Sequence, residues 1–489
     1  MGHEASSNTM TPEERRWVLA RLQAHLAARG GAFEADAAAE QLASDLDFVL
    51  DELLARRISR SVSPVSSLTL PARERDPRRR VVITGVGVIS SLGFSVGEFW
   101  ESLVNGRSGV SHIEGYDLTD SRTKIASQIK NWDPSPWIEP QKAKRMSRAS
   151  QFVVSAARQA LDDSGFPVPE GGSEQLGVLI GSGTTAFPET EAEIKTMWTK
   201  GAHRVSPFFI TTVLPNMPAG QLGLQFGARG WNAAVTSACS SSTTAIGEGA
   251  EIIRRGDVTA MLVGGTEAPI AEISIAGFNS VRAMSTRNDD PEGACRPWDR
   301  TRDGLVAGEG AAVLVLERLD HALARNAPIY AEVLGYGGSC DAYNMIAPDP
   351  SGRSGAQAVR LALHNSGVEP SQVDYINAHG TATLNDPIET RIIKEVFGDR
   401  AYKVPISSTK SMAGHTLAAC GALEGVATVF SLKNGIIPPT INLRNPDPEC
   451  DLDYTPLEAR RSDISVAISQ NFGFGGQNAA VVFRRWNGE

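Results

Sequence analysis

Cys239 lies in a stretch whose residue types suit a reactive nucleophile. An apolar approach ends at Val235, and small hydroxyl side chains occupy positions 240–243 just after the cysteine. Small hydroxyl residues favour a helix start, and a helix N-terminus favours an anion because its first N–H groups have no partner within the helix. We therefore expect a lowered pKa and an available thiolate at Cys239, although a lone cysteine is more often an ordinary buried side chain.

Two histidines are the candidate partners of this thiol. His379 lies at the end of an apolar strand, and His415 lies at the opening of a helix rich in small residues. A histidine in either place is commonly structural. The chain has only eight histidines, however, and these two occupy matching places in two similar segments, which favours a shared site.

A predicted ion pair and a glycine-rich loop accompany these residues. Lys410 and Glu424 are spaced to form either a buried pair or a surface pair of little energetic consequence. Residues 471–478 alternate aromatic side chains with glycines. That pattern leaves backbone N–H groups open and suits a gate or an oxyanion hole, and a plain hairpin with a β-bulge is the alternative.

The elements that must position these residues occur twice along the chain. A helical segment, a Ser-Gly turn and a buried strand ending in Gly and Thr span residues 159–184, and the same order returns at 361–381. The segments 235–237 and 406–411 each lead into a helix rich in small residues. We predict an α/β protein of two duplicated halves, in which Cys239 and both histidines meet at the carboxyl ends of strands.

Composition divides the chain into three predicted parts. Residues 1–79 carry two amphipathic helical patterns and then a linker rich in Ser, Pro and Arg. We interpret them as a helical hairpin that packs on the main body or a dimer mate, or that docks a carrier or another enzyme. Residues 80–328 form the half with the cysteine, and residues 329–489 form the half with both histidines. A Gly-x-Gly after the first strand lacks the rest of a dinucleotide-binding fingerprint, which excludes a Rossmann site there.

Charge and cysteine usage exclude several classes of function. The net charge of −9 over 489 residues, without a basic stripe, argues against nucleic acid as a partner. The five cysteines are scattered and form no CxxC pair, which argues against a disulfide framework and a zinc site, so we expect no bound metal. No apolar run has the length of a membrane span and the N-terminus lacks signal-peptide order, so we expect a cytoplasmic protein.

Four ordered motifs resemble those of β-ketoacyl-acyl carrier protein synthases, in the elongating, type II-like branch of the thiolase superfamily. They are the segment around Cys239, the segment around His379, the segment from Ser408 to His415, and the glycine-rich loop that contains Phe474. The resemblance extends from about residue 80 to the end. It implies a thiolase-like five-layered αβαβα fold preceded by a helical N-terminal extension, and a homodimer.

The resemblance also implies roles for particular residues. Cys239 takes an acyl chain from the phosphopantetheine of an acyl carrier protein, and malonyl-carrier then loses CO2 and attacks the acyl-cysteine. The resemblance assigns no cofactor to the enzyme itself, because its substrates arrive on the carrier. The implied residue roles are these: His379 and His415 stabilise the enolate, Lys410 and Glu424 organise the histidines, the N–H groups of Cys239 and Phe474 form the oxyanion hole with Phe474 as gate, Thr381 and Thr383 lie near the malonyl arm, and Phe278 lies near the acyl tunnel.

Other functions remain open at this point. An enzyme of specialised metabolism could acylate Cys239 and then transfer or cyclise a carrier-tethered substrate without elongation. A thiolase acting on coenzyme A esters is disfavoured because the C-terminal glycine loop has no second cysteine. A non-catalytic partner subunit of a ketosynthase pair is a third alternative, and the presence of Cys239 with both histidines counts against it.

Overall fold

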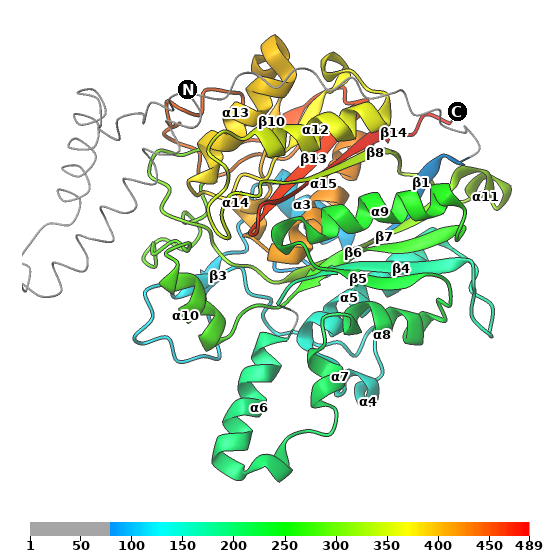
Figure 1. Cartoon of the computed structure of the whole chain (residues 1–489), viewed down its shortest axis with the longest axis vertical. Helices are drawn as coiled ribbons and strands as arrows, with labels where there is room; N and C mark the ends of the chain where they lie inside the picture. The colour runs from blue at the N-terminus through cyan, green and yellow to red at the C-terminus, as the bar shows by residue number, and fades with distance from the viewer. Residues whose placement is uncertain (1–78, 185, 489) are drawn as a thin grey trace, which may run out of the picture. The chain divides into compact units, whose positions relative to one another are not determined.

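A computed structural model describes residues 79–184 and 186–488 (Figure 1). The chain divides into two compact units, of which one comprises Pro71–Pro348 and Gly352–Glu489, and all helices and strands given below belong to it. The helical hairpin predicted within residues 1–79 therefore lies outside the described residues, which begin at Arg79.

Five strands of a ten-stranded sheet come from the first half of the chain, in the order β5-β4-β6-β7-β1. β5 pairs with β4 and β4 with β6 in parallel, whereas β7 is antiparallel to both β6 and β1. Every residue of β1, β4 and β6 is buried, as their continuous apolar runs predict. The bounds are β1 Val81–Ser90, β4 Leu176–Ser182, β5 Asn232–Val235, β6 Ala260–Glu267 and β7 Gly310–Arg318.

The second half repeats this arrangement in the order β10-β9-β13-β14-β8. β10 pairs with β9 and β9 with β13 in parallel, whereas β14 is antiparallel to both β13 and β8. β1 pairs with β8 over residues Val81, Val82 and Ile83, and this short pairing joins the two halves into one sheet. The bounds are β8 Ala331–Cys340, β9 Tyr375–Asn377, β10 Ile406–Ser407, β13 Val466–Gly473 and β14 Gln477–Arg485.

Helices complete the predicted five layers, which follow one another from top to bottom in Figure 1. α12 (Arg353–Ser366) covers β8 and β14, and α5 (Arg148–Ser164) covers β1 and β7 on the far side. α9 (Ser241–Arg255) and α15 (Cys420–Asn434) pack against each other between the two halves of the sheet. The αβαβα fold and its duplication are confirmed.

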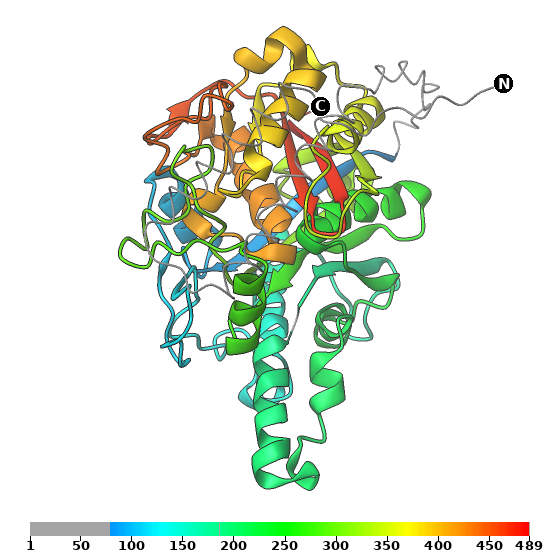
Figure 2. The ribbon, with the colours of Figure 1, turned by 60° about the vertical axis from the view of Figure 1, so that its left-hand side comes forward.

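Shorter elements surround these layers. α6 contacts α7, and Figure 2 shows both projecting away from the sheet. Within the described residues no helix combines the length and the apolarity that crossing a membrane requires. Two small sheets pair β2 Ser111–His112 with β3 Ile125–Ala126 and β11 Ile436–Ile437 with β12 Arg460–Arg461. The remaining helices are α3 Val96–Val104, α4 Pro140–Ala143, α6 Phe187–Lys200, α7 Phe209–Val213, α8 Met217–Phe226, α10 Glu272–Ser280, α11 Leu319–Ala324, α13 Asn385–Phe397 and α14 Lys410–Ala413.

Candidate active site

Cys239 lies in a tight turn between β5 and α9. The turn η3 (Ala238–Ser240) precedes α9, and Ala238 has a φ of 48°, in the left-handed region that residues with a side chain rarely occupy. Hydroxyl groups hold the turn, because Ser240 Oγ donates to Ser237 O at 2.7 Å and Ser241 Oγ accepts from Ser237 N at 2.8 Å. The small hydroxyl residues therefore start the helix as predicted, and the strained backbone presents the thiol.

His415 is the direct neighbour of the thiol. Its Nε2 lies 3.1 Å from Cys239 Sγ, and its backbone N–H donates to Val306 O at 2.7 Å. The expectation that His415 opens a helix is wrong, because α15 begins only at Cys420. Leu417 has a φ of 46°, which breaks the helical path and leaves His415 in a loop.

The turn that follows His415 is the counterpart of the cysteine turn. η6 (Leu417–Ala419) leads into α15 as η3 leads into α9, and each begins with a residue of positive φ, 46° at Leu417 and 48° at Ala238. Because α9 and α15 pack side by side, the two turns lie next to each other. The duplication thus brings the second half's loop against the cysteine.

His379 follows β9 and faces His415. The centroids of their rings are 5.5 Å apart with an angle of 88° between the ring planes. The backbone N–H groups of His379 and Gly380 each donate to the Glu389 carboxylate at 2.7 Å. Lys410 Nζ donates to His379 O at 2.7 Å and lies 3.5 Å from His379 Nδ1. The side chain of His379 is therefore held from its backbone and from its Nδ1 edge.

Lys410 and Glu424 form an ion pair inside the protein. Each side chain is only 2% exposed, so this is a buried ion pair and not a surface pair. Asn471 Nδ2 donates to the second carboxylate oxygen of Glu424 at 2.7 Å. An ion pair without access to water needs such additional hydrogen bonds to offset the loss of hydration.

The ionisation of the thiol differs from the sequence prediction. Burial raises the pKa of Cys239 to about 11, although the nearby Lys410 charge and the Phe474 N–H favour the thiolate. Burial and the charge of Lys410 lower the pKa of both His379 and His415 well below the usual range. The expected low pKa is therefore wrong, because the loss of hydration at a side chain only 7% exposed outweighs the effect of the helix terminus. A neutral thiol faces a neutral imidazole.

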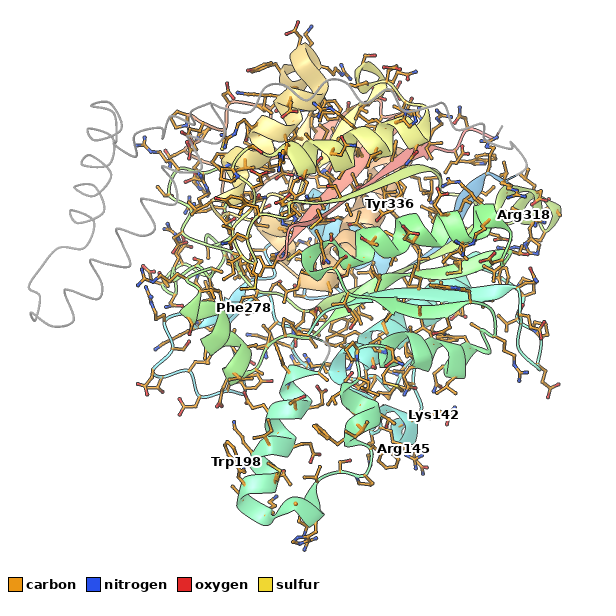
Figure 3. The ribbon with its side chains drawn as sticks, viewed as in Figure 1. Lys142, Arg145, Trp198, Phe278, Arg318 and Tyr336 are labelled. Atoms are coloured by element: carbon orange, nitrogen blue, oxygen red, sulfur yellow. The ribbon has the colours of Figure 1, made fainter. Side chains whose placement is uncertain are left out.

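The remaining predicted residues lie around this centre. The backbone N–H of Phe474 reaches Cys239 from the turn between β13 and β14, and the Phe474 side chain is 36% exposed. Phe278, labelled in Figure 3, lies on α10. It packs against the apolar cluster that includes Cys239. Thr381 and Thr383 lie in the loop after β9, where their hydroxyl groups are 2.8 Å apart.

Sequence reasoning missed three buried polar residues at this site. Asn471 contacts His379 and Glu424, Glu389 holds the His379 backbone, and Glu267 accepts hydrogen bonds from Thr184. Burial also raises the pKa of Glu389 to about 7. Asn471 belongs to the glycine-rich motif, but nothing in its spacing indicates a contact with residues 92 and 47 positions away.

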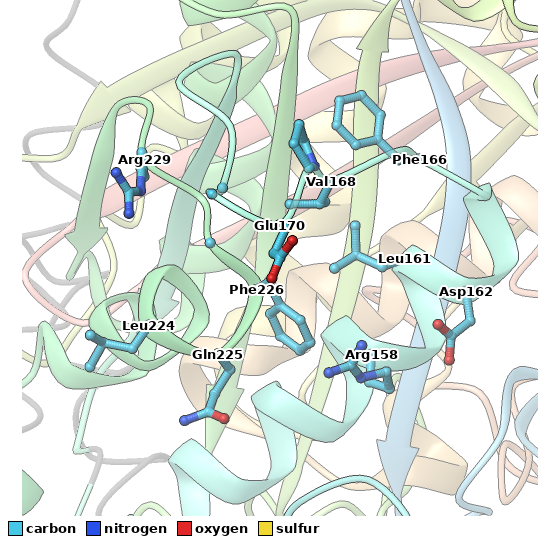
Figure 4. A pocket seen from close by; sticks show the side chains of 14 residues that line it. Arg158, Leu161, Asp162, Phe166, Val168, Glu170, Leu224, Gln225, Phe226 and Arg229 are labelled. Carbon is cyan, nitrogen blue, oxygen red and sulfur yellow. The ribbon is translucent and has the colours of Figure 1, made fainter.

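A separate pocket lies at the C-terminal ends of α5 and α8 (Figure 4). Its volume is about 580 Å³, and its wall includes Arg158, Phe226 and Arg229. None of the predicted site residues lines it. Among residues 79–184 and 186–488, no cluster of three or more His, Cys, Asp or Glu side chains is suited to a metal ion.

Comparison with known proteins identifies the family. The model of the beta-ketoacyl synthase N-terminal domain matches residues 78–322, and the model of the C-terminal domain matches residues 330–444. The chain belongs to the beta-ketoacyl synthase family. As a beta-ketoacyl synthase it is an acyltransferase-type enzyme.

Relatives of this beta-ketoacyl synthase match over most of its length. A 3-oxoacyl-[acyl-carrier-protein] synthase 2 from Coxiella burnetii is 46% identical over 409 residues, which are 83% of this chain and 99% of the relative. The solved ishigamide ketosynthase/chain length factor has a TM-score of 0.79 and 35% identity, covering 84% of this chain and 100% of the other. A type II polyketide synthase acyl-carrier protein in complex with its ketosynthase bound to the hexaketide has a TM-score of 0.77 and 33% identity, with the same coverage.

Proposed function

We propose that this enzyme catalyses decarboxylative Claisen condensation of a Cys239-bound acyl chain with malonyl-carrier protein, in fatty acid or polyketide biosynthesis. The observation that carries the proposal is the contact of Cys239 Sγ with His415 Nε2 at 3.1 Å, beside His379. A thiol next to a neutral imidazole has a base within reach when it attacks a thioester.

The first half-reaction loads the enzyme. Cys239 Sγ attacks the acyl carbonyl carbon while His415 Nε2 takes the thiol proton. The carbon–sulfur bond to the carrier then breaks, and the departing phosphopantetheine thiolate takes up the proton. The raised pKa of Cys239 means that the thiolate forms during attack and is not stored in the free enzyme.

The second half-reaction makes the new carbon–carbon bond. Malonyl-carrier loses CO2, and ring N–H groups of His379 and His415 stabilise the enolate oxygen that results, once the ring proton of His415 has exchanged from Nδ1 to Nε2. The enolate carbon attacks the acyl-cysteine carbonyl, and the N–H groups of Cys239 and Phe474 hold the tetrahedral oxyanion. Its collapse breaks the carbon–sulfur bond and releases the thiolate of Cys239, which takes up one proton from solvent, the proton that the overall reaction consumes. The product is a β-ketoacyl chain on the carrier, two carbons longer.

Other residues shape the site in this proposal. Lys410 and Glu424 hold the two histidines in place, Thr381 and Thr383 contact the malonyl arm, and Phe278 borders the acyl tunnel. Phe474 acts as the gate, which its position in the turn between β13 and β14 and its partial exposure support. The division into residues 80–328 and 329–489 assigns the nucleophile to one half and both histidines to the other.

The proposed partners are an acyl carrier protein and a second copy of the chain. The carrier is supported by the name of the Coxiella burnetii relative and by the polyketide ketosynthase solved with its carrier. The second copy is supported by β5, which ends the ten-stranded sheet and, among residues 79–184 and 186–488, pairs with a strand on one side only. We also propose a cytoplasmic location and no bound cofactor or metal.

Intact-protein mass spectrometry with acyl-carrier and malonyl-carrier tests the function. We expect wild type to gain an acyl mass that Cys239→Ala does not gain, and then to lose it with release of CO2 and of a longer β-ketoacyl-carrier. Acylation without CO2 release would instead support transfer or cyclisation. No acylation across chain lengths would support a non-catalytic partner subunit.

A further inference from the structure

Asn471 is fully buried at the meeting point of the two halves. It lies near the end of β13, and its side-chain amide contacts four groups, which lie on α9, on α15 and in the loop after β9. Its Oδ1 contacts the Thr243 hydroxyl on α9. Its Nδ2 lies 2.7 Å from Glu424 Oε2, 3.2 Å from His379 Nδ1 and 3.5 Å from Cys420 Sγ.

The contact with Glu424 fixes which way the amide faces, and the contact with Thr243 is compatible with that orientation. An amide oxygen only accepts, so the hydroxyl of Thr243 must donate to Oδ1. An ionised carboxylate only accepts, so Nδ2 must donate to Glu424. Exchanging the oxygen and nitrogen of the amide would place two acceptors, the amide oxygen and the carboxylate, against each other. The N–H side of the amide therefore faces His379.

The same logic fixes the proton on His379. Both groups near its Nδ1, the Asn471 amide at 3.2 Å and the Lys410 ammonium at 3.5 Å, have hydrogens to give and no lone pair to offer. Nδ1 must then be the acceptor, and in a neutral ring the single proton resides on Nε2. Nε2 lies on the opposite edge of the ring from Lys410 and Asn471.

We propose that Asn471 is a positioning residue that holds His379 as the Nε2–H tautomer, with that N–H as the donor to the thioester enolate. This role rests on the proposed condensation, which requires a donor from His379. Asn471 is better suited to it than Lys410, because its amide is closer to Nδ1 and is locked by Thr243 and Glu424. The ammonium of Lys410 gives its shortest hydrogen bonds to Glu424 and to His379 O.

The packing of α15 allows this arrangement. A Cβ atom at Gly421 would lie 2.0 Å from Thr243 Oγ1 and 2.8 Å from Asn471 Oδ1. Both distances are too short for any side chain. A glycine at this position therefore keeps the hydroxyl and the amide together.

Asn471→Asp tests the proposal because it keeps the shape and replaces the donor with an acceptor. In this variant the carboxylate draws the proton to Nδ1, so a neutral ring has no Nε2–H. We expect the rate of condensation from pre-acylated enzyme to fall about tenfold to a hundredfold at pH 8, the range associated with one general acid–base group. Acylation of Cys239, followed by intact mass, should stay within about threefold of wild type, because His415 and not His379 contacts the thiol.

The pH profile separates this role from a purely structural one. Lowering the pH protonates the variant ring on both nitrogens and restores an Nε2–H, so condensation by Asn471→Asp should recover as pH falls from 8 to 6. The wild-type ring stays neutral over this range, because the pKa of His379 is lowered by burial and by the charge of Lys410. Its condensation step should show no such recovery. Asn365→Asp is the matched control, since that half-buried amide donates only to Tyr336 O, away from the site.

A spectroscopic measurement identifies the ring tautomer of His379 without an activity assay. In ¹⁵N spectra of histidine-labelled wild type, with His379 assigned by comparison with His379→Gln, we expect an unprotonated Nδ1 and a protonated Nε2. A protonated Nδ1 in wild type would overturn the proposal, as would equal losses in acylation and condensation by Asn471→Asp with no pH recovery. Wild-type enzyme that acylates but never condenses would instead refute the proposed function, and the spectrum would still decide the tautomer.

Discussion

Cys239 is a neutral thiol in the free enzyme, because burial raises its pKa to about 11. It differs in this from cysteines that are exposed at helix N-termini. Its side chain is 7% exposed, and the loss of hydration outweighs the favourable charge of Lys410 and the N–H of Phe474. A neutral thiol is a poor target for oxidants and alkylating agents. The residue becomes nucleophilic only when His415 takes its proton.

Alkylation of Cys239 should therefore depend steeply on pH. With a pKa raised to about 11, the thiolate fraction grows about tenfold per pH unit below that value, so the rate with iodoacetamide should rise without a plateau from pH 6 to 10. Intact mass spectrometry measures the rate. Cys239→Ala identifies adducts on the exposed Cys340. A plateau below pH 8 would show a preformed thiolate–imidazolium pair and contradict this prediction.

At the scale of elements, the site depends on how closely α15 approaches α9. The two helices start from equivalent turns and pack along each other between the halves of the sheet. Glycines on α15 make the approach possible, but they differ in what faces them. A Cβ atom at Gly421 would meet Thr243 Oγ1 at 2.0 Å, whereas one at Gly425 would meet the flexible end of Ile246 at 3.1 Å.

Gly421→Ala and Gly425→Ala should thus have different effects. Overpacking at Gly421 should destabilise the protein by about 1–3 kcal/mol and slow condensation by displacing Asn471. At Gly425 the gain in helix propensity, about 1 kcal/mol, should offset the small adjustment of Ile246. Thermal unfolding and condensation rates of the two variants measure the difference. Equal losses of stability would contradict the packing argument.

The sequence predicted the elements better than the contacts between them. Buried strands such as β1 and β4 and the start of α9 follow from apolar runs and hydroxyl residues. The thiol pKa and the loop around His415 were predicted wrongly, because burial of Cys239 and the positive φ of Leu417 depend on tertiary packing. Asn471 was missed for the same reason, since its partners lie on other strands and helices.

At the scale of the whole molecule, the proposed dimer would cover an otherwise open edge. β5 ends the sheet, and exposed apolar side chains lie on α8, which contacts β5, on α7, which contacts α8, and directly before β5. Ile210 is 61% exposed, Leu224 75% and Trp231 38%. An exposed strand edge next to apolar side chains is a common site of association between chains.

Ile210→Asp combined with Leu224→Asp should weaken this association. A carboxylate buried at the interface without a partner should raise the dimer dissociation constant about a hundredfold, equivalent to ~3 kcal/mol. Sedimentation velocity over a range of concentrations measures the constant. Leu323→Asp is the matched control, because that leucine is 52% exposed on α11. A monomeric wild type, or an unchanged constant in the double variant, would contradict the prediction.

The short pairing of β1 with β8 has a consequence for biosynthesis. The ribosome completes the half that carries Cys239 before it makes His379, His415 and Asn471, and the strand that holds Asn471 is next to last in the chain. The two halves share one apolar core, to which Ile246 of the first half and Ala422 of the second both belong. A chain that ends before His379 therefore has the cysteine with no base beside it. The thiol gains its partners only when β8 docks on β1 and the second half closes, so a truncated product has the nucleophile and no means of using it.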